Sequence, residues 1–179
     1  METWDAIRAR RNVRRYRPDA VSDEHLRQIL EAGRRAPSGG NRQHWDFVLV
    51  TDRRQLADLG AIWQGGQYIA AAAASIALVL PQPRDEQAVL LDQFDLGQAT
   101  YAMMLAATDL GIGTGHSLVG DQDKARAILG VPQTHVVSYL LGVGHPADRP
   151  LRPIVTPKRR PFDEVVHFGR WQGKDDPTR

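Results

Sequence analysis

Residues 75–80 constrain the fold more than any other part of the chain, because they carry no charge and end at a proline. Such a short apolar run before Pro81 predicts a β-strand that is buried on both faces. Apolar residues at helical spacing then predict a long helix that begins between residues 86 and 91, ends at Leu110 and has Gly111 as its C-cap. The centre of the chain therefore combines a fully covered strand with a helix long enough to lie across a sheet.

The remaining elements follow from caps and apolar periodicity. Ser22, Asp52 and Asp121 are good N-cap residues, and each precedes an apolar pattern of helical period. Residues 111–115 are expected to form a glycine-rich turn, and the tail from His145 is expected to be ordered only by packing or by partners. The other expected elements are a helix over residues 3–11, a helix over 22–35, a strand over 47–50, a helix over 52–59, a helix after residue 121 and a strand over 136–143.

This order of elements indicates an α+β or mixed α/β protein. The chain has 179 residues and shows no repeat or linker, so residues 1–179 are expected to form a single domain. It has no cysteine, which excludes disulfides, thiolate metal sites and cysteine nucleophiles. Its six histidines lack metal-ligand spacing, so no metal is expected. The sequence has no membrane-spanning run or signal peptide, and a cytoplasmic location is expected.

Positive charge gathers near both ends of the chain. Six arginines lie between Arg8 and Arg17, and a second cluster occupies residues 158–160. Between them, residues 36–43 form a loop rich in glycine and amide side chains. Because guanidinium groups bind phosphate in a bidentate manner, this set indicates a pocket for a compact phosphorylated ligand, with solvated helix ends and a charged tail as the alternative. A net charge of only +2 argues against a general nucleic-acid surface.

Two glycine-containing motifs carry weaker alternatives. Residues 111–115 resemble a dinucleotide fingerprint, but they follow a helix, whereas that fingerprint follows a strand. Residues 115–120 resemble a Gly-x-Ser-x-Gly nucleophile elbow whose second glycine comes one residue late. A serine hydrolase that uses Ser117 therefore stays open. Its triad partners would come from Asp148, Asp163, His145 and His167.

Four motifs, taken in order, resemble those of the nitroreductase family of FMN flavoproteins, and the resemblance spans essentially the whole chain. They are Arg10-Arg11-Asn12-Val13-Arg14, where the family has Arg-Arg-Ser-x-Arg; residues 36–45, where the family has Ala-Pro-Ser-x-x-Asn-x-Gln-Pro-Trp; Leu110-Gly111-Ile112-Gly113; and Lys158-Arg159-Arg160-Pro161, which matches a late Lys-x-Arg-Pro. The chain departs from the family at Asn12, which replaces a serine, and at His44, which replaces a proline.

The resemblance implies an α+β sandwich, in which helices wrap a central, mostly antiparallel sheet, and an intertwined homodimer with FMN at the subunit interface. Arg10, Asn12, Lys158 and Arg160 would hold the phosphate end, and Arg14 would face the N1 and O2 edge of the flavin, where a cation favours reduction. Residues 37–41 would line the ring from the neighbouring subunit. The implied cofactor-binding residues are Arg10, Arg11, Asn12, Arg14, Pro37, Ser38, Gly39, Asn41, Gly115, His116, Ser117, Lys158 and Arg160.

The implied activity is ping-pong hydride transfer from NADH or NADPH, through flavin N5, to a nitroaromatic, a quinone or a related small acceptor. The cofactor makes the bonds, so no catalytic side chain is expected. Flavin breakdown, dehalogenation and dehydrogenation remain possible on the same scaffold. Trp63, Tyr68 and Phe94 are candidates for stacking on substrate, with core or dimer packing as the alternative. A non-catalytic module that binds phosphorylated ligands or RNA is the second alternative, beside the hydrolase.

Overall fold

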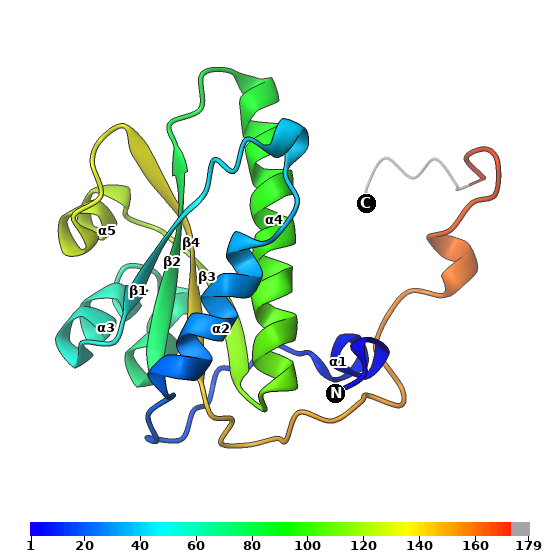
Figure 1. Cartoon of the computed structure of the whole chain (residues 1–179), viewed down its shortest axis with the longest axis horizontal. Helices are drawn as coiled ribbons and strands as arrows, with labels where there is room; N and C mark the ends of the chain where they lie inside the picture. Colours follow the sequence, from blue (N-terminus) through cyan, green and yellow to red (C-terminus); the bar gives the residue numbers. More distant parts are fainter. Residues whose placement is uncertain (173–179) are drawn as a thin grey trace.

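A four-stranded antiparallel sheet forms the centre of the molecule in the computed structural model, which describes residues 1–172 (Figure 1). The strands are β1 (Asp46–Val50), β2 (Ala74–Pro81), β3 (Gly113–Leu118) and β4 (His135–Gly144), in the spatial order β1-β2-β4-β3. Every neighbouring pair is antiparallel. The predicted α+β class with a mostly antiparallel sheet is confirmed.

Helices cover both faces of this sheet. The α-helices of the described residues are α1 (Thr3–Ala9), α2 (Asp23–Arg34), α3 (Arg53–Gly60), α4 (Glu86–Asp109) and α5 (Gln122–Leu129). Three short 3-10 helices add η1 (Gly39–Asn41), η2 (Gln64–Ala71) and η3 (Phe162–Glu164). In Figure 1, α2 and α4 lie on one side of the sheet, and α3 and α5 lie on the other.

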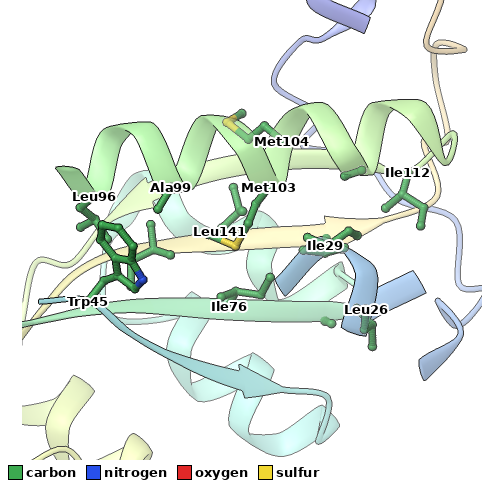
Figure 2. Packing of buried hydrophobic residues seen from close by; sticks show 14 of the residues in the cluster. Leu26, Ile29, Trp45, Ile76, Leu96, Ala99, Met103, Met104, Ile112 and Leu141 are labelled. Carbon is green, nitrogen blue, oxygen red and sulfur yellow. The ribbon is translucent and has the colours of Figure 1, made fainter. Parts of the chain in front are cut away.

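The strand β2 contributes to two hydrophobic cores, one on each face of the sheet, because its alternate side chains point to opposite faces. Ile76 and Leu78 pack with the α2 and α4 side chains, as Figure 2 shows for Ile76, whereas Ala77 and Val79 pack with α3, η2 and α5. Seven of its eight residues, all but Pro81, are buried. The prediction of a strand buried on both faces is confirmed.

The predicted N-termini of three helices are confirmed by their capping hydrogen bonds. The side chains of Ser22, Asp52 and Asp121 each accept from a backbone N–H three residues later, at 3.3, 2.9 and 3.0 Å. The long helix begins at Glu86, and Gly111 beyond its end has a φ of +72°, the left-handed conformation that glycine adopts most readily.

Two sequence predictions are wrong. The helix expected over residues 3–11 ends at Ala9, because Asn12 and Val13 pair with Thr114 in β3 and the chain leaves the helix at Arg10 to reach it. The glycine-rich segment after α4 continues from its turn into the edge strand β3, although the sequence analysis assigned no strand there. The apolar and polar alternation that predicts a strand is missing here, because Gly113 and Gly115 have no side chains. The strand forms because it pairs with β4 on one side and receives the backbone of residues 12–14 on the other. The short helix η2 was also missed.

The tail follows the N-terminal segment after it leaves β4. The N–H groups of Arg17, Ala147 and Ile154 make backbone hydrogen bonds that join the two segments, at 2.9–3.1 Å. Beyond residue 154 the described chain passes α1 and stands apart from the sheet (Figure 1). Large apolar side chains there are exposed to solvent, namely Val155, Phe162, Val165, Phe168 and Trp171. Packing therefore orders the first part of the tail, as expected. No helix within residues 1–172 is long and apolar enough to cross a membrane.

Candidate functional site

The N-terminal arginine segment, residues 10–14, lies along the free edge of β3. Asn12 forms a parallel bridge with Thr114, and the Val13 N–H donates to the Thr114 carbonyl at 2.8 Å. This approach requires glycine on the strand, because a Cβ at Gly115 would lie 2.4 Å from the Val13 carbonyl oxygen. Tyr16 fixes the same carbonyl by donating its hydroxyl at 2.8 Å. The backbone that carries the arginines is therefore held at one position on the sheet.

A groove of about 510 Å³ opens between α4 and the sheet beside this segment. Most of its lining is apolar. The side chains that bring nitrogen atoms to it are those of Arg10, Gln93 and His116. The His116 ring meets the Tyr139 ring edge-on, with centroids 6.4 Å apart. The lining residues are Arg10, Leu78, Gln93, Leu96, Gly97, Thr100, Tyr101, Met104, His116 and Tyr139.

A second hollow of about 430 Å³ lies on the other side of Arg10 and is more cationic. Arg10 and Tyr101 line both hollows, and the Arg10 guanidinium carbon lies 5.8 Å from the Tyr101 ring centroid. Arg8 from α1 and Arg159 from the tail complete its positive charge. The N-terminal segment and residues 154–159 of the tail therefore meet around Arg10, next to an apolar groove.

The tail cations are arranged differently from the sequence motif. Arg159 lines the cationic hollow, whereas Arg160 donates to the Glu164 carbonyl oxygen at 2.6 Å and to its carboxylate at 3.3 Å. Lys158 is exposed and lines neither hollow. Arg159 was not among the predicted residues because the family motif leaves that position open. The uninterrupted basic run of residues 158–160 was the signal that could have included it.

The charges near β3 act on one another. Incomplete hydration of the His116 ring, and then the positive charges of Arg14 and Arg10, hold the pKa of His116 below its ordinary value. The Arg14 guanidinium carbon also lies 5.6 Å from the Tyr68 ring centroid, in cation–π contact. Burial raises the pKa of Tyr68 to about 12, and the Arg14 charge opposes that rise. Arg14 is therefore close enough to the His116 imidazole and to the neutral Tyr68 phenol to affect the pKa of both.

The loop of residues 36–43 is held against α4 in a strained form. Asn41 and Gln43 have φ values of 56° and 53°, which are unusual for residues with a side chain. The Gly39 N–H donates to both oxygens of Asp95, at 3.1 and 3.2 Å, and Arg42 pairs with the same carboxylate at 3.8 Å. The Gln43 N–H donates to the Ser38 hydroxyl at 3.0 Å.

This loop does not meet Arg10 within one chain. The predicted residues Pro37, Ser38, Gly39 and Asn41 line neither the groove nor the cationic hollow. Gly115 and His116 do lie on β3 beside the arginine segment, as does Ser117.

Ser117 does not have the setting of a catalytic serine. It lies within β3, and its buried hydroxyl donates to the Leu118 carbonyl at 3.1 Å. A Cβ at Gly66 would lie 2.7 Å from that hydroxyl, so its surroundings are closed on one side. Within the part of the chain that the structure describes, no group of three or more histidine or acidic residues is arranged to hold a metal.

The three aromatic candidates for substrate stacking have separate surroundings. Trp63 packs closely against glycine backbone at Gly65 and Gly120. Phe94 is exposed on α4, and Tyr68 lies against the glycine backbone of β3 and β4. None of them lines the groove. Its aromatic residues are instead Tyr101 and Tyr139, which the sequence analysis missed. Tyr101 could have been found from the helical spacing of the small and polar residues at Gln93, Gly97, Thr100 and Tyr101.

Comparison with known proteins gives one consistent result. The sequence model of the Nitroreductase family matches residues 7–89 and 59–145. A protein of Archaeoglobus fulgidus, provisionally named an NADH dehydrogenase/NAD(P)H nitroreductase, is 33% identical over 151 residues, which cover 82% of this chain and 87% of that protein. The NADPH-flavin oxidoreductase of Vibrio harveyi is 28% identical over 185 residues, which cover 95% and 75%. The solved NADPH:FMN oxidoreductase from Vibrio harveyi in complex with NAD+ superposes with a TM-score of 0.82 at 25% identity, covering 95% of this chain and 78% of that one.

Proposed function

The chain belongs to the nitroreductase family, and we propose that it is an FMN-dependent NAD(P)H oxidoreductase. The observation that carries this proposal is the meeting of the N-terminal arginine segment and residues 154–159 of the tail around Arg10, between a cationic hollow and an apolar groove. The names of the relatives described above support the same activity. We propose further that residues 1–179 act as one domain in the cytoplasm and that the acceptor is a nitroaromatic, a quinone or a related small molecule.

The residues present fit FMN. A flavin phosphate needs cations with directed N–H groups, and Arg10, Arg8 and Arg159 supply them around one hollow. A flat aromatic ring needs an apolar surface, which the groove offers at a volume of about 510 Å³, within the range usual for small-molecule sites. Arg14 and His116 stand at the β3 edge, where they can meet the polar rim of such a ring.

The side chains of this protein bind and orient, and bound FMN supplies the hydride acceptor and donor at its N5 atom. In the proposal, Arg10 and Asn12 from the N-terminal segment and Arg159 from the tail would hold the phosphate, and Lys158 and Arg160 would add positive charge from the same basic run. The apolar groove excludes water from the reacting face. Arg14 would stabilise negative charge on a reduced flavin bound at this edge. No side chain acts as acid, base or nucleophile in this scheme.

The proposed assembly is a homodimer with an FMN site at each subunit interface. It is supported by the large apolar side chains that one chain leaves exposed on α4 and on the tail, including Leu90, Phe94, Phe168 and Trp171. In the dimer, the partner would supply the strained loop with Pro37, Ser38, Gly39 and Asn41, which one chain keeps away from its own Arg10.

Anaerobic titration of the purified protein tests the function. The protein is expected to be yellow, or to become so with FMN, and to lose its flavin absorbance on addition of NADH or NADPH. Arg10→Ala should weaken FMN binding, whereas Arg54→Ala, an exposed arginine on α3, should not. A protein that cannot be loaded with FMN refutes the proposal. Esterase activity that disappears in Ser117→Ala would support the hydrolase instead, and salt-sensitive RNA binding without flavin would support the binding module.

A further inference from the structure

Tyr68 occupies an unusual position for a residue without an assigned role. Its ring lies against the backbone of two adjacent strands, where a Cβ at Gly115 or Gly142 would come within 3.3 or 3.2 Å of its Cε2 atom. A side chain at either glycine would therefore crowd the ring. The ring comes from η2, so β3, β4 and η2 together fix its place.

The buried Tyr68 hydroxyl makes no hydrogen bond of standard geometry within the described residues, although burial raises its pKa and the nearby Arg14 side chain lowers it through charge and hydrogen bonding. A buried hydroxyl without a well-formed hydrogen bond costs free energy, so hydrogen bonding alone does not explain why a tyrosine ring occupies this place. The partner that the ring does have is a cation, because the Arg14 guanidinium lies over it at 5.6 Å. Such a contact stabilises the position of the cation, and more strongly where the cation is desolvated.

Arg14 itself is free to move without this contact. Its side chain is exposed, and it forms no ion pair with a described carboxylate. Its backbone is fixed by the neighbouring Val13 on β3, but a long arginine side chain has many rotamers that a fixed backbone does not select. The Tyr68 ring is thus the contact that determines where the charge of Arg14 stands.

We infer that Tyr68 is a positioning residue that holds the Arg14 guanidinium at the edge of β3 and thereby raises the reduction potential of the flavin bound there. The inference rests on the proposed function, because it needs a flavin at this edge. A cation in a fixed place stabilises arriving negative charge more than one that must first be ordered. Tyr68 acts through Arg14 and need not touch the flavin.

The test compares Tyr68→Leu and Tyr68→Phe with Arg14→Ala and with the Tyr68→Leu/Arg14→Ala double variant. The measured quantity is the midpoint potential of the bound flavin, expressed as the ratio of affinities for reduced and oxidised FMN. Tyr68→Leu should lower this ratio about twofold to fivefold, the effect of a cation–π contact at an exposed site. Tyr68→Phe keeps the ring and should match the parent. The double variant should match Arg14→Ala, because Tyr68 has no effect without its cation.

A second readout does not need flavin. The Arg14 guanidinium lies over an aromatic ring, so the NMR resonances of its N–H protons should be shifted upfield in the full-length protein. The shift should vanish in Tyr68→Leu and persist in Tyr68→Phe. An unchanged affinity ratio in Tyr68→Leu, a loss in Tyr68→Phe as large as in Tyr68→Leu, or an equal effect with and without Arg14 overturns the inference. Failure to bind FMN would overturn the proposed function separately, and the NMR arm would still decide whether Tyr68 holds Arg14.

Discussion

Gly115→Ala should damage the proposed cofactor site without placing any side chain in it. The new methyl group would lie 2.4 Å from the Val13 carbonyl oxygen, about 1 Å inside the 3.4 Å at which ordinary contact begins. The obstacle is backbone, so the N-terminal segment must move away from β3. A retreat of about 1 Å breaks the 2.8 Å bond from the Val13 N–H to Thr114 and disturbs the 2.8 Å bond from Tyr16. At about 1 kcal/mol for each hydrogen bond, the free energy of unfolding should fall by about 1–3 kcal/mol.

The same displacement should weaken FMN binding, because the moved segment carries Arg10, Asn12 and Arg14. Each 1.4 kcal/mol of lost binding free energy raises the dissociation constant about tenfold. Flavin fluorescence titration measures this constant, and denaturant unfolding of the flavin-free protein measures the stability. Both quantities should change in Gly115→Ala.

Gly130→Ala is the matched control. Gly130 ends α5 with a φ of +69°, and a Cβ there would touch nothing within 4 Å. The substitution therefore costs only backbone strain, on the order of 1 kcal/mol, far from the arginine segment. It should lower stability and leave the FMN dissociation constant unchanged. If both variants weaken FMN binding alike, or if Gly115→Ala leaves it unchanged, the close approach of Val13 does not position the site.

Three further predictions concern a titration, a loop and a helix end. The folded-state pKa of His116 lies below its value of about 6.5 in the unfolded chain. The stability that His116 contributes is therefore complete above pH 6.5 and is lost as the pH falls through the folded-state pKa. NMR titration of His116 should give a lowered midpoint that rises in Arg14→Ala, and a midpoint at the ordinary value would contradict this. Asp95→Ala removes the acceptor of the Gly39 N–H and a partner of Arg42. It should release the loop of residues 36–43, lower the free energy of unfolding by about 1–3 kcal/mol and weaken FMN binding. Asp95→Asn keeps an acceptor and should have smaller effects, and equal effects of the two variants would show that the acceptor is not what matters. Ser22→Ala removes the N-cap of α2 and should cost about 1 kcal/mol in denaturant unfolding without changing the FMN dissociation constant, and a changed constant would link α2 to the site.

The sequence predicted those elements whose signals are local. The caps at Ser22, Asp52 and Asp121 are such signals, because one side chain and the next turn of backbone decide them. The apolar run that became β2 was equally clear. The edge strand β3 was missed because its glycines conceal the alternation of a strand, and its existence depends on β4 and on residues 12–14, which lie far away in sequence.

The candidate site was predictable in its residue types but less so in its geometry. The arginine segment and the tail do meet, and Arg10 lies at their junction. Sequence alone did not separate the neighbouring cations of the tail, because Arg160 turns to Glu164 through a contact that depends on η3. It also missed Asp95, whose role as a clamp for Gly39 depends on how α4 passes the loop.

The glycines after α4 illustrate why a motif needs its structural setting before it is given a role. On spacing alone, Gly111, Gly113 and Gly115 invite comparison with loops in which glycine lets backbone N–H groups approach a phosphate. In this fold Gly113 and Gly115 admit another part of the same chain, since a Cβ at either would collide with Val13. The absence of side chains at Gly113 and Gly115 therefore allows the arginine segment to pack against β3. The positions of the cations at this site depend on residues that carry no functional group at all.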